Sequence, residues 1–142
     1  MTVAVLLLGA CATKKDTRAD HDRVEARLQQ YSHLVLAMDT AGMAAMFAPE
    51  GEMVNPRQPA VKGREAIRKF LDGYSDYKVL SNADLSGSVL IDGDTAEQLG
   101  TYRQEVRSPQ GKVFEASGRL EVAWIKDSTG EWLIQQLETF PN

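Results

Sequence analysis

A change of hydrophobic period near residue 78 constrains the fold of this chain more than any other feature of its sequence. From there onward apolar and polar residues alternate, which is typical of half-buried β-strands. The separators between the runs have the composition of hairpin turns, as in Asp92-Gly93-Asp94. The alternating runs cover about residues 78–91, 95–107, 112–126 and 131–140. The pattern predicts long antiparallel strands, which must twist and bend.

The N-terminal part of the chain has helical periodicity instead. Apolar residues spaced by three or four predict a first helix over about residues 17–38: Val24, Leu28, Tyr31, Val35 and Met38. Asp39 is suited to cap a short second helix over 41–47, and a third is expected over 63–74. A short strand is predicted at 52–55, after a turn at Pro49-Glu50-Gly51.

Alternation also separates the two faces of the predicted sheet. One side of the 112–126 strand carries Phe114, Ala116, Gly118, Leu120, Val122 and Trp124, and one side of the 95–107 strand carries Ala96, Gln98, Gly100, Tyr102, Gln104 and Val106. An apolar sheet face must be covered, and the helices are the available cover. The sequence therefore predicts an α+β fold, with three N-terminal helices packed in the hollow of a curved antiparallel sheet.

Composition excludes several classes of protein. The 142 residues suit one domain, and the net charge of −4 without a run of three basic residues argues against nucleic-acid binding. A single cysteine permits no internal disulfide, and no apolar run is long enough to span a bilayer. His21 and His33 have no partners at metal-ligand spacing, so we predict neither a metal site nor a cofactor.

The N-terminus carries a motif of its own. Leu8-Gly9-Ala10-Cys11 resembles a bacterial lipobox and follows a short apolar run. The resemblance implies a signal-peptide-like segment at 1–10, lipid on Cys11, a tether over 11–16 and a single domain over 17–142. The protein would then be anchored on the periplasmic side of the bacterial cell envelope. The alternative is a cytoplasmic protein in which Cys11 is an ordinary thiol.

The order and spacing of several short segments resemble a known superfamily. The segments are Leu28-Gln29-Gln30-Tyr31, Asp39, residues 46–51, Asn55-Pro56, residues 63–70, Gly100-Thr101-Tyr102, residues 118–124 and residues 130–134. Together they resemble the nuclear transport factor 2-like superfamily, and within it the SnoaL-like and ketosteroid-isomerase-like group. The resemblance implies a cone-shaped α+β fold, and this fold hosts many unrelated functions.

The resemblance also implies where a site would lie. Steroid isomerases of the family use an aspartate base, with a tyrosine and a protonated aspartic acid to stabilise the enolate. By resemblance these three positions are Asn55, Tyr31 and Gly118. Asparagine does not accept a proton at neutral pH and glycine has no side chain, so we do not expect catalysis by that mechanism. Glu138 is the one acid whose position in its strand points towards the inside.

Three functions follow as hypotheses. The first is a non-catalytic binder of a small, neutral, largely apolar molecule, with a pocket formed by Tyr31, Asn55, Gln98, Tyr102, Gly118 and Leu120. The second is a SnoaL-like isomerase, cyclase or hydrolase with an unrecognised base such as Glu138. The third is an interaction module that forms a homodimer through the outer sheet face, as family members often do. Tyr31 is otherwise a core residue, and Asn55 otherwise braces the Asn-Pro turn.

Overall fold

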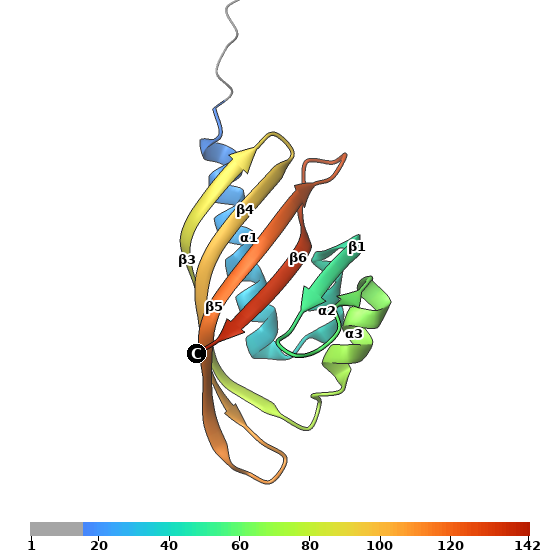
Figure 1. The fold of residues 1–142 in the computed structure, drawn as a ribbon, viewed down its shortest axis with the longest axis vertical. Coiled ribbons are helices and arrows are strands. Elements are labelled where there is room, and N and C mark those ends of the chain that lie inside the picture. Colours follow the sequence, from blue (N-terminus) through green and yellow to red (C-terminus); the bar gives the residue numbers. More distant parts are fainter. Residues whose placement is uncertain (1–15) are drawn as a thin grey trace, which may run out of the picture.

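The computed structural model describes residues 16–142, so Cys11 and the signal-peptide-like segment lie outside the described part of the chain. This part of the chain contains three helices and six strands, and its last four elements are all strands (Figure 1). In chain order they are α1 (Arg18–Ala37), α2 (Thr40–Ala45), β1 (Phe47–Val54), β2 (Val61–Lys62), α3 (Arg64–Asp72), β3 (Lys78–Asp92), β4 (Thr95–Arg107), β5 (Val113–Lys126) and β6 (Trp132–Pro141). Among residues 16–142 no helix is long and apolar enough to cross a membrane.

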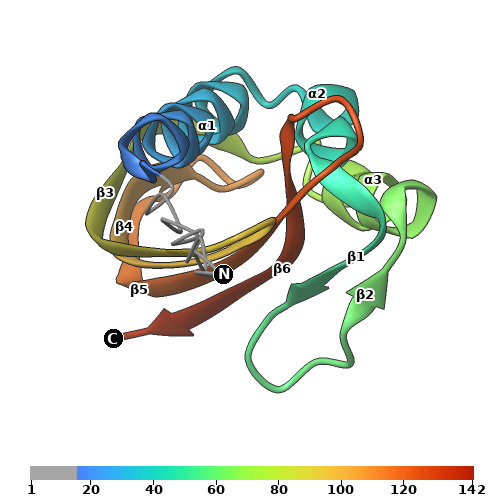
Figure 2. The same ribbon diagram turned by 90° about the horizontal axis from the view of Figure 1, so that it is seen from above.

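All six strands belong to one curved sheet, in the order β2-β1-β6-β5-β4-β3. The neighbouring strands are antiparallel except for β1 and β6, which are parallel, so the sheet is mixed. Helix α1 lies across the concave face of β3, β4 and β5, and α2 and α3 lie beside β1 (Figure 2). The predicted α+β cone, with helices in the hollow of a bent sheet, is confirmed. Strand β1 begins at Phe47, earlier than predicted, with an irregular register between Phe47 and Glu52.

Helix α1 packs on the sheet through the predicted apolar stripe. Val24, Leu28 and Tyr31 are buried. The helix ends at Met38, whose positive φ of 53° turns the chain. Asp39 then caps α2 as predicted, because its Oδ1 accepts a hydrogen bond from the backbone N–H of Gly42 at 2.8 Å. These two turns place α2 beside the end of α1.

Alternation holds along β4 and β5 but is broken in β3. The inward-facing side chains of β4 and β5 are the ones that the sequence predicted, from Ala96 at one end to Val106 at the other in β4. Strand β3 shifts register between Val79 and Ser81, and again between Ser86 and Ser88. Each extra residue reverses which side chains face inward. The register of β3 therefore determines which of its residues line the cavity between the sheet and the helices.

Candidate functional site

A cavity of about 480 Å³ lies between the helices and the concave face of the sheet. This volume lies within the range of small-molecule sites. Its wall is mostly apolar and contains one charged side chain, Asp84, among the residues that the structure describes. Helices α1 and α3, the segment after α3, and strands β1, β3, β4, β5 and β6 all contribute to it. Residues far apart in the sequence therefore meet around one cavity that is open at one end.

Asp84 is the chemically most distinctive residue of the cavity. It is only 6% exposed, although it is an aspartate. Burial raises the pKa of its carboxyl to about 6, while hydrogen bonds from Asn82 and Ser32 act in the opposite direction. A carboxyl with this pKa exchanges its proton near neutral pH, which is the property of a general acid or base.

A hydrogen-bonded network holds the carboxyl of Asp84 in place. Asn82 Nδ2 donates to Ser32 Oγ at 2.8 Å and lies 3.4 Å from Asp84 Oδ2. Gln104 Nε2 donates to Asn82 Oδ1 at 2.8 Å, and Gln29 Nε2 donates to the backbone oxygen of Asp84 at 2.9 Å. Helix α1 and strands β3 and β4 are thereby joined around one carboxyl. Such a network fixes the side chain rather than leaving it mobile.

Tyr31 is the neighbour of Asp84 on helix α1. Its ring is packed edge-on against Phe47, with centroids 6.3 Å apart, and the residue is 7% exposed. Burial raises the pKa of its phenol, and the negative charge of Asp84 raises it further. The hydroxyl therefore keeps its proton at all ordinary pH values. Because no hydrogen bond engages this hydroxyl within residues 16–142, it is free to donate to a bound molecule.

Asn55 brings a second donor to the cavity. Its Oδ1 is 3.5 Å from the hydroxyl of Thr139, whereas its Nδ2 is buried and has no partner among the described residues. An unpaired buried donor costs about 1–3 kcal/mol, so such groups are rare and call for an explanation. Asn55 lines the cavity. The nitrogen itself has no accessible surface, so a small shift of the Asn55 side chain would be needed to bring the amide to a ligand oxygen.

Within residues 16–142 no three His, Cys, Asp or Glu side chains are grouped so that they could hold a metal ion. The polar groups of the cavity are one carboxyl, phenols, the hydroxyls of Thr40 and Thr139, and amides. These groups can donate and accept hydrogen bonds.

Comparison with known proteins identifies the family. The family model of the SnoaL-like domain matches residues 16–138, which is most of the chain. The chain belongs to the SnoaL-like domain family. No curated protein matches it. The nuclear transport factor 2-like superfamily predicted from the sequence is thereby confirmed.

Solved structures share the fold of this SnoaL-like domain at low sequence identity. A ketosteroid isomerase-like protein from Erwinia carotovora atroseptica has a TM-score of 0.81 and 17% identity, with 87% of this chain and 97% of that chain covered. ActVI-ORFA from Streptomyces coelicolor has a TM-score of 0.74 and 15% identity, covering 87% and 98%. A nuclear transport factor 2-like protein from Novosphingobium aromaticivorans has a TM-score of 0.69 and 20% identity, covering 85% and 80%. Similarity at this level describes the fold alone.

The SnoaL-like domain brings together four of the six side chains predicted for its pocket. Tyr31, Asn55, Tyr102 and Leu120 line the cavity. Gln98 instead lies in the core, where its Oε1 accepts a hydrogen bond from Trp124 Nε1 at 3.0 Å. Because it is fully buried between other protein groups, it has no access to a ligand.

Gly118 does not line the cavity either. A Cβ at this position would collide with the backbone oxygen of Phe140 in β6. The close approach of β6 therefore leaves no room for an acidic side chain on β5. Glu138, the other acid considered from the sequence, lies outside the cavity wall. The expectation that no carboxylate other than Glu138 points inward is wrong, because Asp84 does.

A bulge in β3 explains why Asp84 was missed. Strict alternation from Val79 would place Leu85 inside and Asp84 outside. In the structure Leu85 is 63% exposed and Asp84 is buried. The bulge between Val79 and Ser81 turns Asp84 inward and contains no glycine or proline that would mark it in the sequence, whereas Gly87 marks only the second bulge, beyond Asp84.

Proposed function

We propose that this domain binds a small, neutral, largely apolar molecule in the cavity. The single observation that carries the proposal is the buried, unpaired Nδ2 of Asn55 at the wall of an apolar cavity. The phenol of Tyr31 supplies a second donor, so a carbonyl or hydroxyl oxygen is the complementary group. The wall offers no cation, and Asp84 disfavours anions, because an unpaired buried charge is heavily penalised.

A matched pair of probes tests this proposal. Naphthyl methyl ketone is neutral and carries one carbonyl, whereas naphthoic acid is an anion of nearly the same shape. We expect calorimetry at pH 8 to show binding of the ketone and not of the acid. The variant Asn55→Leu should weaken ketone binding by about 3- to 10-fold, which corresponds to one hydrogen bond. Binding of the acid in preference to the ketone would contradict the proposal.

A second function, proton transfer, is supported by Asp84. Above its pKa of about 6 the carboxylate is a base in an apolar cavity. It would break a C–H bond next to the ligand carbonyl and take the proton, while the electron pair moves to the carbonyl oxygen. The hydroxyl of Tyr31 and the amide of Asn55 would stabilise the resulting enolate. The proton then returns to carbon, so the step is balanced without a cofactor.

Hydrogen–deuterium exchange at carbon tests proton transfer without knowledge of the product. In D₂O, wild-type protein should speed deuterium uptake into the methyl group of naphthyl methyl ketone, as followed by NMR. Asp84→Asn should reduce this rate at least about 100-fold, which is typical for a general base. Exchange that survives in Asp84→Asn would remove Asp84 as the base. Binding of the ketone without exchange would leave the domain as a non-catalytic binder, which is the simpler hypothesis from the sequence.

Attachment to the cell envelope is a separate proposal. It rests on the motif Leu8-Gly9-Ala10-Cys11, which lies outside the described residues. Expression in a bacterium behind a complete signal sequence should produce a protein that begins with lipidated Cys11. Intact mass spectrometry measures this directly. An unmodified chain that still carries residues 1–10 would favour the cytoplasmic alternative.

Dimerisation through the outer sheet face is supported by exposed leucines. Leu85 and Leu99 are 63% and 51% exposed on neighbouring strands. On the same face Arg103 forms an ion pair with Glu115 at 2.8 Å, so both charges needed for a self-complementary contact are present. We propose a second copy of this chain as the partner. Sedimentation should show a dimer that Leu99→Glu dissociates, and a monomeric wild type would contradict this.

A further inference from the structure

We infer that the mouth of the cavity is a ring-binding subsite, formed by Tyr74, Tyr77 and Phe114, which selects ligands with a planar ring. The inference rests on the binding function proposed above and specifies the class of ligand. All three side chains line the cavity, together with Phe70. Tyr74 and Tyr77 come from the segment between α3 and β3, and Phe114 comes from the start of β5.

An aromatic series runs along one side of the mouth. The rings of Phe70 and Tyr74 are 5.6 Å apart at 67°, and those of Tyr74 and Tyr77 are 5.7 Å apart at 60°. Each ring therefore meets its neighbour edge to face, the geometry that aromatic pairs prefer. A ring inserted next to Tyr74 or Tyr77 continues the same packing.

Exposure shows that these residues are at the entrance. Tyr74 is 44% exposed and Phe114 is 39% exposed, whereas Tyr31 and Asp84 in the interior are below 10%. In Figure 1 the hairpin between β4 and β5 projects past the rest of the sheet, and the chain after α3 crosses towards it. Aromatic faces left open on both sides of an entrance are available to a ligand ring.

The strand register gives the distance between the mouth and the interior. Val106 on β4 is paired with Phe114 on one side and with Val79 on the other, while Tyr102 on β4 is paired with Asp84. Val106 and Tyr102 are four residues apart on β4, which is roughly 13 Å along a strand. A ligand that reaches both ends is therefore an elongated neutral molecule, with its oxygen near Tyr31 and Asn55 and its ring at the mouth.

A comparison of two ketones tests the subsite. Naphthyl methyl ketone has a planar aromatic ring, and decahydronaphthyl methyl ketone has the same skeleton without aromatic character. Wild-type protein should bind the aromatic ketone about 3- to 10-fold more tightly, as expected for aromatic packing. The double variant Tyr74→Leu/Phe114→Leu should lose this preference while its affinity for the saturated ketone stays within about 2-fold.

Two control variants separate ring packing from general damage. Tyr74→Phe keeps the ring and should keep the preference. Phe140→Leu removes a ring outside the cavity, one packed 4.8 Å from the guanidinium of Arg119, and should also keep it. Circular dichroism and thermal melts confirm that each variant is folded before its affinities are compared.

The outcomes distinguish the ring-binding subsite from the binding function on which it rests. Equal binding of the two ketones by wild-type protein, or an unchanged preference in the double variant, overturns the ring-binding subsite and leaves the binding function intact. Binding of neither ketone overturns both. If the double variant converts a wild-type dimer into a monomer and keeps the ring preference, the mouth is a contact between copies of the chain and the subsite is wrong.

Discussion

The two ends of the cone differ in how their buried polar groups are paired. At the closed end, the polar side chains around Trp124 and Trp132 are joined to one another by hydrogen bonds. Trp124 Nε1 donates to Gln98 Oε1, and Gln98 Nε2 donates to Ser86 Oγ, both at 3.0 Å. Ser86 Oγ in turn donates to Glu25 at 2.9 Å. The chain of hydrogen bonds runs from the core to the surface of α1.

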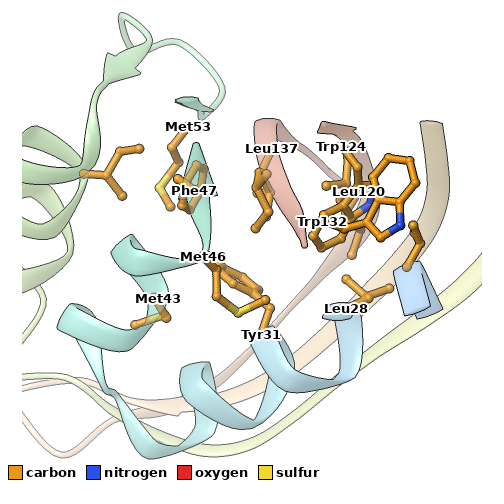
Figure 3. Packing of buried hydrophobic residues seen from close by; sticks show 14 of the residues in the cluster. Leu28, Tyr31, Met43, Met46, Phe47, Met53, Leu120, Trp124, Trp132 and Leu137 are labelled. Atoms are coloured by element: carbon orange, nitrogen blue, oxygen red, sulfur yellow. The ribbon is translucent and has the colours of Figure 1, made fainter. Parts of the chain in front are cut away.

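The closed end also contains a largely buried ion pair. Lys126 Nζ is 2.8 Å from Asp20 Oδ1 and lies 5.0 Å from the centre of the Trp132 ring. Trp132 Nε1 donates to the same carboxylate at 3.2 Å. Trp124 and Trp132 are packed together beside Leu120 and Leu28 (Figure 3). The side chains at this end are closely packed and their polar groups are paired, as expected of a structural core.

The open end has the same kinds of polar group but leaves some of them unpaired. Asn55 Nδ2 lacks a partner, and the Asp84 carboxyl is held at a pKa of about 6 by burial. Such features reduce stability, and natural proteins retain them mainly at functional sites. The core of this domain therefore differs from its candidate site in whether buried polar groups have hydrogen-bond partners, and not in whether those groups are buried.

The largest expected effect is at the closed end. Trp124→Ala should lower the free energy of unfolding by about 3–5 kcal/mol, because it leaves a large cavity and an unpaired Gln98 oxygen. Phe114→Leu at the open end should cost under about 1 kcal/mol, because its ring is partly exposed. Denaturant unfolding of both variants measures the difference. Equal costs would mean that the two ends are packed alike.

The second prediction concerns pH and the open end. The folded-state pKa of Asp84 is raised to about 6 from 3.8, so the folded protein holds this proton more tightly than the unfolded chain does. The contribution of Asp84 to stability is therefore greatest below about pH 4 and falls by about 3 kcal/mol as pH rises through 6. Asp84→Asn should gain that amount relative to wild type between pH 4 and pH 7. If the free energies of unfolding of the two proteins depended on pH in the same way, the pKa of Asp84 would not be raised by folding.

The third prediction concerns Asn55, where one substitution should raise stability and weaken ligand binding. Asn55→Leu has similar volume and removes the unpaired amide, so it should raise the free energy of unfolding by about 1 kcal/mol. The same change should weaken ketone binding, as proposed above. Thermal melts with and without ketone measure both effects in one experiment. A loss of stability would indicate that Asn55 braces the turn before Pro56.

The smallest effect is expected on the outer face of the sheet. Glu121→Ala should change stability by under about 0.5 kcal/mol in the monomer, because its carboxylate is exposed and its ion pair with Arg119 is 3.8 Å long. Leu120→Ala, one residue earlier and buried, should cost about 2–5 kcal/mol. Denaturant melts of this neighbouring pair check the assignment of faces along β5, which similar costs would contradict.

Much of this fold is determined by local sequence. Periodicity located the three helices and the four long strands, Asp39 identified the cap of α2, and alternation assigned the faces of β4 and β5. These features depend on residues close together in the chain, whose spacing repeats the geometry of a helix or a strand. Alternation placed Tyr102 and Leu120 on the face that lines the cavity, and the family resemblance pointed to Tyr31 and Asn55.

The chemistry of the site was decided by tertiary structure. The bulge between Val79 and Ser81 in β3 reverses the alternation that follows it, buries Asp84 and exposes Leu85. The approach of β6 excludes a side chain at Gly118, and the partner of Gln98 is Trp124 on another strand. A bulge depends on how two strands accommodate the curvature of the whole sheet, and a pKa depends on burial by groups distant in the chain. Local sequence therefore determined the helices, strands and sheet faces of this domain, and long-range packing determined which carboxyl lies inside its cavity.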